Sequence, residues 1–398
     1  MYLTHLSLTQ YRNFNRLDTS VPPGAVILVG ANAQGKTSLL EAIYFLATMT
    51  AFQAENDRQV INFFAAEEPL AVARIVADFV RGTKQQRMEV RIIQENNGSG
   101  KVRKEVLLDG VKRKVNEVFR HFNAVLFLPH MLKIIDGAPE ERRRYLNIAC
   151  AQVLPDYAAH LALYTRTLTQ RNALLKQLSE RGGDPAQLVY WDEQLSESGA
   201  RLIQARIQAV QALERLGARL HAELTRGKEV LRLSYQPAFD PLPQPEKQLA
   251  LPMDAPADRS GLSLEKIRLG FLDALTALRR EEINRGMTTI GPHRDEIRFA
   301  ANTVDLGLYG SRGQIRTAML AMKLAEMNWM KEQSGHWPVL LLDEVLAELD
   351  GERRQDLLER LAQPEQVLMS TTDLDQFSPQ FVERSSIWNI QAGRLSSL

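Results

Sequence analysis

Gly30-Ala31-Asn32-Ala33-Gln34-Gly35-Lys36-Thr37 is the stretch of sequence that decides the fold. It fits the pattern G-x-x-x-x-G-K-[ST], the phosphate-binding loop known as Walker A. The apolar run 25–29 before it predicts a buried strand, and residues 37–43 after it begin a helical pattern. In a strand–loop–helix unit, backbone N–H groups and the helix N-terminus surround phosphate groups. We therefore predict nucleotide binding, with Lys36 at the β- and γ-phosphates and the Thr37 hydroxyl on Mg²⁺.

A second half of the site is predicted by Trp337-Pro338-Val339-Leu340-Leu341-Leu342-Asp343-Glu344, an apolar strand that ends in two acids. In a parallel sheet beside the phosphate loop, Asp343 would hold Mg²⁺ through water. Glu344 would orient and deprotonate the attacking water, as phosphoryl transfer requires. Apolar strands often end in polar turns, so this Walker B pattern is common alone. Paired with Walker A, it predicts ATP hydrolysis.

Composition limits the class of protein. The 398 residues suffice for two or three domains, and 44% hydrophobic with 24% charged residues is typical of a globular protein. No apolar run approaches the roughly 18 residues of a membrane span, and no signal peptide is evident, so we expect a cytoplasmic protein with no membrane partner. The single cysteine, Cys150, excludes a multi-cysteine zinc site. A net charge of +1 means that DNA binding must use local basic patches.

The pattern of apolar residues changes along the chain. Up to about residue 138 it favours strands, and from Pro139 onward it favours helices. A long helix over 191–225 should pair with a helix over 157–178, around a turn at 181–185. The other expected strands are 70–76, 88–93, 105–108, 124–128 and 296–299; the expected turns are 96–100 and 109–110; a Pro-rich connector covers 237–256 and a further helix 262–284.

Two candidate clusters each allow two interpretations. Tyr11-Arg12-Asn13-Phe14 precedes the Walker strand, where a nucleotide fold often presents groups to the adenine side. Alternatively, Phe14 belongs to the core and Arg12 is solvated. Arg142-Arg143-Arg144 is either a phosphate-contacting cluster or the solvated face of a helix. We favour the phosphate-contacting interpretation of the arginines.

A serine–glycine segment, Tyr309-Gly310-Ser311-Arg312-Gly313-Gln314-Ile315-Arg316, precedes a helical stretch at 317–331. Small residues at a helix N-terminus make a second anion site. The alternative is a plain capped helix with Ser311 as its N-cap. After Walker B, Asp350 is either an N-cap or a subunit-crossing aspartate. Residues 366–373 predict a last strand with hydroxyls at its end.

The order of these segments is that of ABC-type ATPases, and within that class the chain resembles the RecF family of bacterial recombination mediators. Walker A and Walker B are shared by many NTPases. The Gly-Pro-His-Arg-Asp stretch and the Ser-x-Gly-Gln-x-Arg-Thr signature are much more specific to RecF-like proteins. The likeness spans nearly the whole chain and is carried by residues 11–14, 30–38, 125–132, 142–144, 291–295, 311–317, 341–350 and 370–373.

The resemblance implies an α/β fold: an ABC-type ATPase head, with a P-loop, a mixed sheet and flanking helices, plus an inserted, mainly helical domain. The head would comprise residues 1–138 and 289–398, and the insertion residues 139–288. Catalysis would use Glu344, Lys36 and Thr372, the last at the switch position, and Thr37 and Asp343 would bind the metal. The implied ATP contacts are Arg12, Asn13, Gly30, Ala31, Asn32, Ala33, Gln34, Gly35, Lys36, Thr37 and Ser38, with Ser311, Gly313, Gln314 and Asp350.

The resemblance also implies partners. Two subunits would form an ATP-dependent, head-to-tail homodimer on double-stranded and gapped DNA, with Arg142, Arg143 and Arg144 as DNA contacts. The family acts with RecR and RecO to load RecA, with slow, DNA-dependent ATP hydrolysis. Two departures from the family pattern are the lack of arginine in residues 50–57 and a less acidic loop at 129–132. The alternative function is a RecF-like or SMC-like ATPase that drives a different DNA-processing or defence partner.

Overall fold

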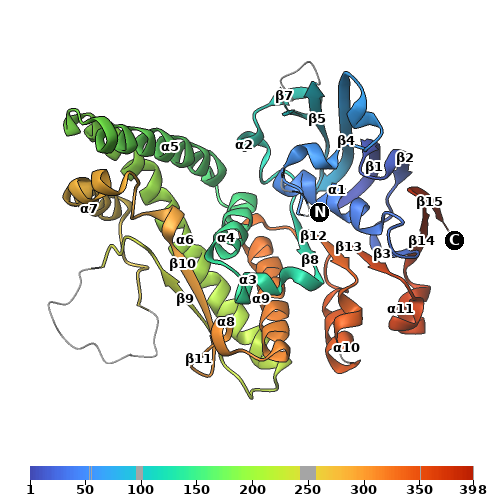
Figure 1. Cartoon of the computed structure of the whole chain (residues 1–398). Coiled ribbons are helices and arrows are strands. Elements are labelled where there is room, and N and C mark those ends of the chain that lie inside the picture. The colour runs from blue at the N-terminus through green and yellow to red at the C-terminus, as the bar shows by residue number, and fades with distance from the viewer. Residues whose placement is uncertain (53, 55, 96–101, 243–256, 350, 398) are drawn as a thin grey trace. The chain divides into compact units, whose positions relative to one another are not determined.

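The computed structural model describes residues 1–52, 54, 56–95, 102–242, 257–349 and 351–397. The chain packs into two compact units, whose elements are labelled in Figure 1. The head unit combines Met1–Met131 with Glu326–Leu398, and the inserted unit is Leu132–Ala325. Within the described part of the chain, no helix is both long and apolar enough to cross a membrane.

A six-stranded sheet forms the centre of the head unit. Five strands are parallel, and β15 runs antiparallel at one edge. The inner strands carry nearly continuous apolar runs, as expected where a parallel sheet is covered on both faces. Helix α1 (Lys36–Thr48) packs against three strands of this sheet, one of them at its edge. Across the sheet the order is β15 (Arg394–Ser397), β14 (Ser386–Gln391), β3 (Gly24–Val29), β13 (Gln366–Thr371), β12 (Val339–Asp343) and β8 (Ala124–Phe127).

A second, fully antiparallel sheet completes the head unit. The Asp109-Gly110 turn is confirmed: both residues have positive φ, which a two-residue hairpin loop requires. The turn expected at 96–100 lies outside the described residues. The strand order is β2 (Phe14–Ser20), β1 (Tyr2–Tyr11), β4 (Leu70–Arg81), β5 (Lys84–Glu95), β6 (Val102–Leu108) and β7 (Val111–Arg113); α2 (Val115–Val118) follows β7, and α10 (Gly351–Arg360) and α11 (Pro379–Glu383) lie in the C-terminal segment.

The inserted unit is mainly helical, as predicted. Helices α5 (Tyr157–Arg181) and α6 (Leu188–Leu224) pack together as the expected hairpin, and α7 (Leu264–Arg285) packs on both. Gly182 and Gly183, both with positive φ, make the turn between α5 and α6. The remaining elements are α3 (Lys133–Asp136), α4 (Pro139–Val153), β9 (Leu231–Gln236), β10 (Glu296–Ala301), β11 (Val304–Asp305), α8 (Leu306–Tyr309) and the first part of α9 (Arg312–Ser334).

The division of the chain differs from the expected boundaries at 138 and 288. The inserted unit begins at Leu132 and extends to Ala325, so it includes the serine–glycine segment that we had assigned to the head. The reason is strand pairing: β10 pairs antiparallel with β9 over its whole length, and β11 pairs with β10. The sheet β11–β10–β9 thus holds residues after 288 to the insertion.

In the stretch Gly291–Asp295, Gly291, Pro292 and Asp295 are buried, His293 is partly buried and Arg294 is exposed. Arg206, itself buried, donates to the Asp295 carboxylate at 2.6 Å. Burial lowers the pKa of His293 to about 4, so its ring is neutral at physiological pH. Nδ1 of His293 lies 2.8 Å from the Tyr164 hydroxyl, which donates to it. This family-specific stretch therefore stabilises the fold through hydrogen bonds between segments far apart in sequence.

Candidate nucleotide site

The phosphate loop follows β3 at Gly30 and enters α1 at Lys36, as predicted. A Cβ at Gly30 would collide with the carbonyl oxygen of Ile390. Gly35 has a φ of +116°, and a Cβ there would lie 2.6 Å from the amide nitrogen of Asn13. Both positions therefore require glycine, and the loop keeps the tight turn that phosphate binding needs.

Lys36 and Glu344 are neighbours in the head unit. The Lys36 side chain is buried, and its Nζ donates to the carbonyl oxygens of Gly30 at 2.6 Å and Ala31 at 3.1 Å. The same Nζ lies 3.3 Å from Oε1 of Glu344, which follows β12. The two side chains predicted for phosphate binding and for water activation are therefore brought together.

Thr37 and Asp343 form the predicted metal-binding pair. Oγ1 of Thr37 donates to Oδ2 of Asp343 at 2.8 Å. Burial raises the pKa of Asp343, while the hydrogen bonds from Ser370 and Thr37 and the charge of Lys36 act in the opposite direction. No group of three or more His, Cys, Asp or Glu side chains that could hold a metal ion occurs in the described ranges. A hydroxyl and one carboxylate fit Mg²⁺ that also takes phosphate oxygens and water.

Ser370 is a site residue that the sequence did not reveal. Its Oγ donates to Oδ1 of Asp343 at 2.5 Å and accepts the backbone N–H of Glu344 at 3.1 Å. We had expected the hydroxyl at the end of this strand to be Thr372, which is exposed beyond β13 and does not line the nucleotide pocket. The catalytic assignment of Thr372 stays a prediction, and Asp350 lies outside the described residues.

A pocket of about 770 Å³ opens over the phosphate loop in the head unit. Its volume lies within the range of about 300–1,000 Å³ that small-molecule sites occupy. The lining combines polar side chains, among them Lys36 and Glu344, with two phenylalanines. The lining residues are Arg12, Asn13, Asn32, Ala33, Gln34, Gly35, Lys36, Thr37, Ser38, Gln59, Ile61, Asn62, Phe63, Phe64 and Glu344.

The residues of the Tyr11–Phe14 turn differ in location: two are buried in the core and two line the pocket. Tyr11 and Phe14 are fully buried in the core, so neither ring is available to a nucleotide. Arg12 and Asn13 do line the pocket. Arg12 forms a two-point ion pair with Glu41 at 2.7 and 2.8 Å, and Asn13 donates to the Gln34 carbonyl at 2.9 Å. Asn13 therefore contacts the phosphate loop directly, whereas Arg12 is bound to α1.

The serine–glycine segment forms a capping box at the start of α9. The Ser311 hydroxyl accepts the N–H of Gln314 at 3.2 Å, and the Gln314 side chain accepts the N–H of Ser311 at 3.0 Å. Gln314 also donates to Glu229 at 2.9 Å. The capped-helix interpretation is thus confirmed within the inserted unit. A nucleotide role for Ser311, Gly313 and Gln314 stays a prediction.

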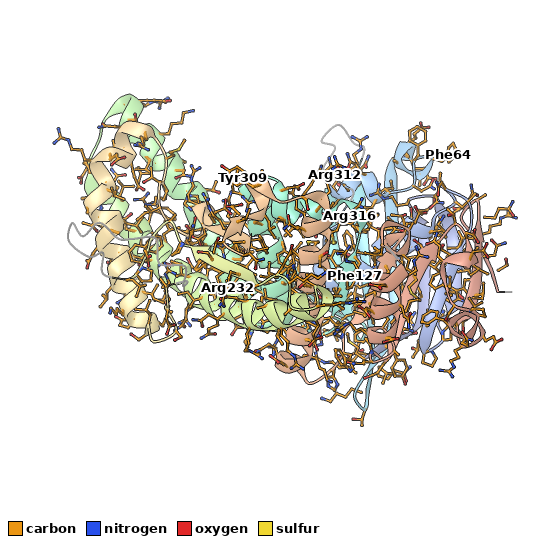
Figure 2. The ribbon with its side chains drawn as sticks, turned by 90° about the horizontal axis from the view of Figure 1, so that it is seen from below. Phe64, Phe127, Arg232, Tyr309, Arg312 and Arg316 are labelled. Atoms are coloured by element: carbon orange, nitrogen blue, oxygen red, sulfur yellow. The ribbon has the colours of Figure 1, made fainter. Side chains whose placement is uncertain are left out.

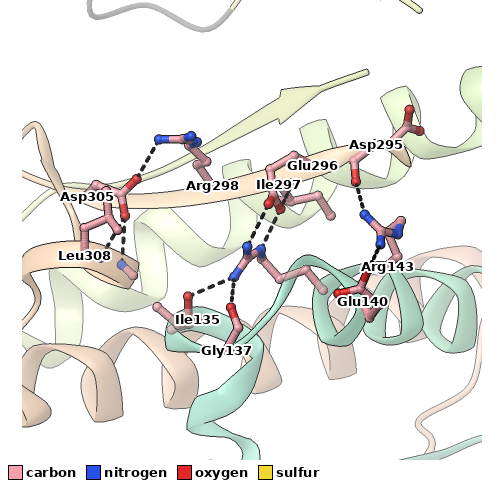
Figure 3. Close-up of polar contacts among 12 residues, drawn as sticks. Ile135, Gly137, Glu140, Arg143, Asp295, Glu296, Ile297, Arg298, Asp305 and Leu308 are labelled. Atoms are coloured by element: carbon pink, nitrogen blue, oxygen red, sulfur yellow. Dashed lines mark hydrogen bonds and ion pairs between the residues drawn. The ribbon is translucent and has the colours of Figure 1, made fainter. Parts of the chain in front are cut away.

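The arginine cluster is not the open phosphate-contacting surface that we expected. Arg142 forms a two-point ion pair with Glu296 at 2.5 and 2.7 Å and donates to two backbone carbonyls. Arg143 donates to the Asp295 carbonyl at 2.9 Å and to Glu140 at 2.6 Å, as Figure 3 shows. Only Arg144 of the three is exposed. The partner Glu296 comes from a strand 154 positions away, which local sequence cannot reveal.

We expect Arg142→Ala to destabilise the protein rather than weaken DNA binding. It leaves Glu296 and two carbonyls without their donor, and hydrogen bonds to a charged group contribute roughly 1.5–3 kcal/mol each. Urea unfolding would measure the loss of about 2 kcal/mol. The matched control is Arg201→Ala, which removes the exposed Arg201–Glu197 pair and should cost about 0.5 kcal/mol or less. A flatter salt dependence of DNA binding at unchanged stability would show that Arg142 contacts phosphate instead.

The fold and the site together define a P-loop ATPase head of the ABC type. The phosphate loop leaves one strand of a mostly parallel sheet, and the acids of Walker B leave another strand of the same sheet. In comparisons with known proteins, a family model described as "RecF/RecN/SMC N terminal domain" matches residues 2–387. The chain belongs to the RecF family.

Individual relatives agree with this assignment. The DNA replication and repair protein RecF of Roseiflexus castenholzii is 39% identical, over 99% of each chain. That of Chloroflexus aggregans is 37% identical, also over 99% of each. A solved structure described as the recombination mediator protein RecF with ATP superposes with a TM-score of 0.83 at 28% identity, covering 100% of this chain and 97% of that one. An SMC head at 15% identity, with a TM-score of 0.51, supports the fold alone.

Proposed function

We propose that this chain is an ATP-dependent DNA-binding protein of recombinational repair that binds Mg²⁺ and ATP in the head pocket. One observation carries the proposal: the Lys36 ammonium, the Thr37 hydroxyl and the carboxylates of Asp343 and Glu344 converge around one phosphate loop. Relatives named DNA replication and repair protein RecF support the biological role.

The chain's own residues divide the hydrolysis between them. Lys36 Nζ would exchange its two loop carbonyls for the β- and γ-phosphate oxygens. Thr37 and Asp343 would hold Mg²⁺, which supplies positive charge to the phosphoryl oxygens. Glu344 would orient a water for in-line attack and accept its proton at a carboxylate oxygen. Ser370 would position both acids, through its bonds to the Asp343 side chain and the Glu344 backbone.

The composite site would form between two copies of the chain. Gly313 supports this, because its own fold does not require a glycine: only the Ser311 hydroxyl, at 4.0 Å, would come near an added Cβ, and φ is not positive. Near a helix start, alanine would be the more stable choice. A close approach of another molecule explains the glycine, and the γ-phosphate held by a second subunit is the candidate that Ser311 and the N-terminus of α9 fit.

The DNA and protein partners are proposed from the family. Double-stranded and gapped DNA would be bound by the ATP-dependent homodimer, and RecR and RecO would cooperate in loading RecA. Hydrolysis would be weak and stimulated by DNA, in a cytoplasmic protein. Arg144, the exposed member of the arginine cluster, would be a DNA contact.

Retention on DNA tests this function. Gapped and plain duplexes of equal length would be immobilised and washed after loading the protein with Mg²⁺ and ATP, ADP or no nucleotide. We expect ATP to increase retention selectively on the gapped duplex. ATP that changes retention on neither DNA would contradict the proposal and favour an ATPase that drives a different DNA-processing or defence partner.

A further inference from the structure

Two exposed phenylalanines lie at the rim of the nucleotide pocket. Phe63 is 73% exposed and Phe64 is 80% exposed, and their rings meet edge to face with centroids 5.7 Å apart. Figure 2 shows the Phe64 ring projecting from the ribbon of the head unit. Scattered surface hydrophobics need no explanation, but two adjacent aromatic rings lining a polar pocket form a concentrated apolar surface.

The segment that carries these rings is held in place by partly buried hydrogen bonds. Asn62 donates its side-chain amide to the Arg12 carbonyl at 2.7 Å and its backbone N–H to the Gln10 carbonyl at 2.8 Å. Its side-chain oxygen accepts the N–H of Phe64 at 3.1 Å. Arg12 in turn donates its N–H to the Val60 carbonyl at 2.8 Å. The backbone under the rings is therefore fixed, although the rings themselves are in water.

Hydrogen bonds of Arg12 and Asn13 connect the aromatic segment to the phosphate loop. Arg12 and Asn13 are consecutive, and Asn13 donates to the carbonyl of Gln34 inside the loop. The guanidinium of Arg12 donates to the Gln59 carbonyl at 3.0 Å. Phe63 and Phe64 line the same pocket as Lys36, so a ligand with its phosphates at Lys36 has two aromatic rings within that pocket. A nucleoside triphosphate matches this combination, since one end is anionic and the other is a flat aromatic base.

We propose that Phe63 and Phe64 form the base subsite of the pocket and stack against the adenine of ATP. This inference rests on the proposed function and assigns a part of the site that the phosphate-binding motifs leave open. Stacking between a base and an aromatic side chain is tolerant of base identity, because every base presents a π-face. The subsite therefore contributes affinity for purine nucleotides in general more than discrimination among them.

Calorimetric titration with ATP and with inorganic tripolyphosphate, both with Mg²⁺, separates the base subsite from the phosphate subsite. Phe63→Ala or Phe64→Ala should raise the Kd for ATP by about 5- to 150-fold, the range for loss of one aromatic–base stack. The Kd for tripolyphosphate should not change, because that ligand has no base. Phe→Leu at each position keeps apolar volume but removes the π-face, so it should recover only part of the loss.

Tyr190→Ala is the matched control, since Tyr190 is an aromatic residue that is 59% exposed on α6 and lines no part of this pocket. If the wild-type protein binds ATP and both alanine variants bind it with the same affinity, the base subsite is overturned but the proposed function is not. Unchanged ATP affinity with loss of dimerisation or of DNA retention would also overturn it, and would assign the rings to a second copy or to DNA. A wild-type protein that binds neither ligand would overturn the proposed function itself.

Discussion

Replacing Glu344 with glutamine should reduce ATP hydrolysis by about 10²- to 10⁴-fold while leaving ATP binding nearly unchanged. The amide has the shape of the carboxylate but cannot accept the proton of the attacking water. Its neighbour Lys36 keeps both bonds to the loop carbonyls, so the phosphate-binding geometry remains. Phosphate release under steady state measures the first effect, and calorimetric titration with Mg²⁺ and ATP the second.

The Glu344→Gln variant should accumulate the ATP-bound dimer, because the dimer forms but cannot hydrolyse its ATP. Lys36→Ala is the contrasting control: it removes the charge at the β- and γ-phosphates and should weaken binding itself. Light scattering after gel filtration with ATP would distinguish a trapped dimer from a monomer. Wild-type hydrolysis by the Glu344→Gln protein would mean that another group activates the water.

Ser311→Arg should abolish ATP-dependent dimerisation and hydrolysis while leaving ATP binding by the single chain intact. The substitution puts bulk and positive charge at the start of α9, outside the pocket formed by the phosphate loop. It also removes the N-cap, which costs about 1 kcal/mol, so a second variant is needed. Ser311→Asp keeps a capping oxygen but places a negative charge where the γ-phosphate of the other subunit would lie. Both variants should fail in the same way if the site is shared.

Mixing the Ser311→Arg and Lys36→Ala proteins tests the shared site further. In a mixed dimer one composite site carries both lesions and the other carries none. Each mixed dimer keeps one intact site of two, so hydrolysis should return, to at most about half of the wild-type rate. Full activity of Ser311→Arg alone would rule out the shared site. A mixture that stays inactive, although mixed dimers form, would mean that the two sites act only together.

The parts of the site that could be predicted from sequence are those encoded over a few consecutive residues. Walker A fixes a strand, a turn and a helix within one short stretch, and Walker B ends a strand that is buried throughout. Their convergence could be expected because both motifs lie at the carboxyl ends of parallel strands. Ser370 could not be identified in this way, since its role depends on the register that places Asp343 opposite it. The sequence showed several hydroxyls there, and the family resemblance pointed to Thr372 rather than Ser370.

The arginine cluster and the domain boundary could not be predicted because both depend on distant pairings. A run of three arginines has the same appearance whether it faces solvent or a buried carboxylate. Arg142 is held by an ion pair with Glu296. The strand that carries Glu296, β10, is positioned by its pairing with β9. Likewise, Phe63 and Phe64 are of a residue type that is usually buried, so the sequence favours a place in the core for them. They are nevertheless exposed, next to Asn62, whose hydrogen bonds to the Arg12 carbonyl and the Phe64 N–H come from the folded chain.

The position of β3 in the central sheet has a consequence for how the protein is made. This strand carries the phosphate loop, yet both of its neighbours, β13 and β14, come from the last part of the chain. On the ribosome, at roughly 5–20 residues per second, β3 must wait on the order of tens of seconds without its partners. The inserted unit is continuous in sequence and can fold during that interval. Nascent chains should therefore expose an apolar strand for much of their synthesis, and chaperones that hold such strands should decide how much active protein a cell obtains.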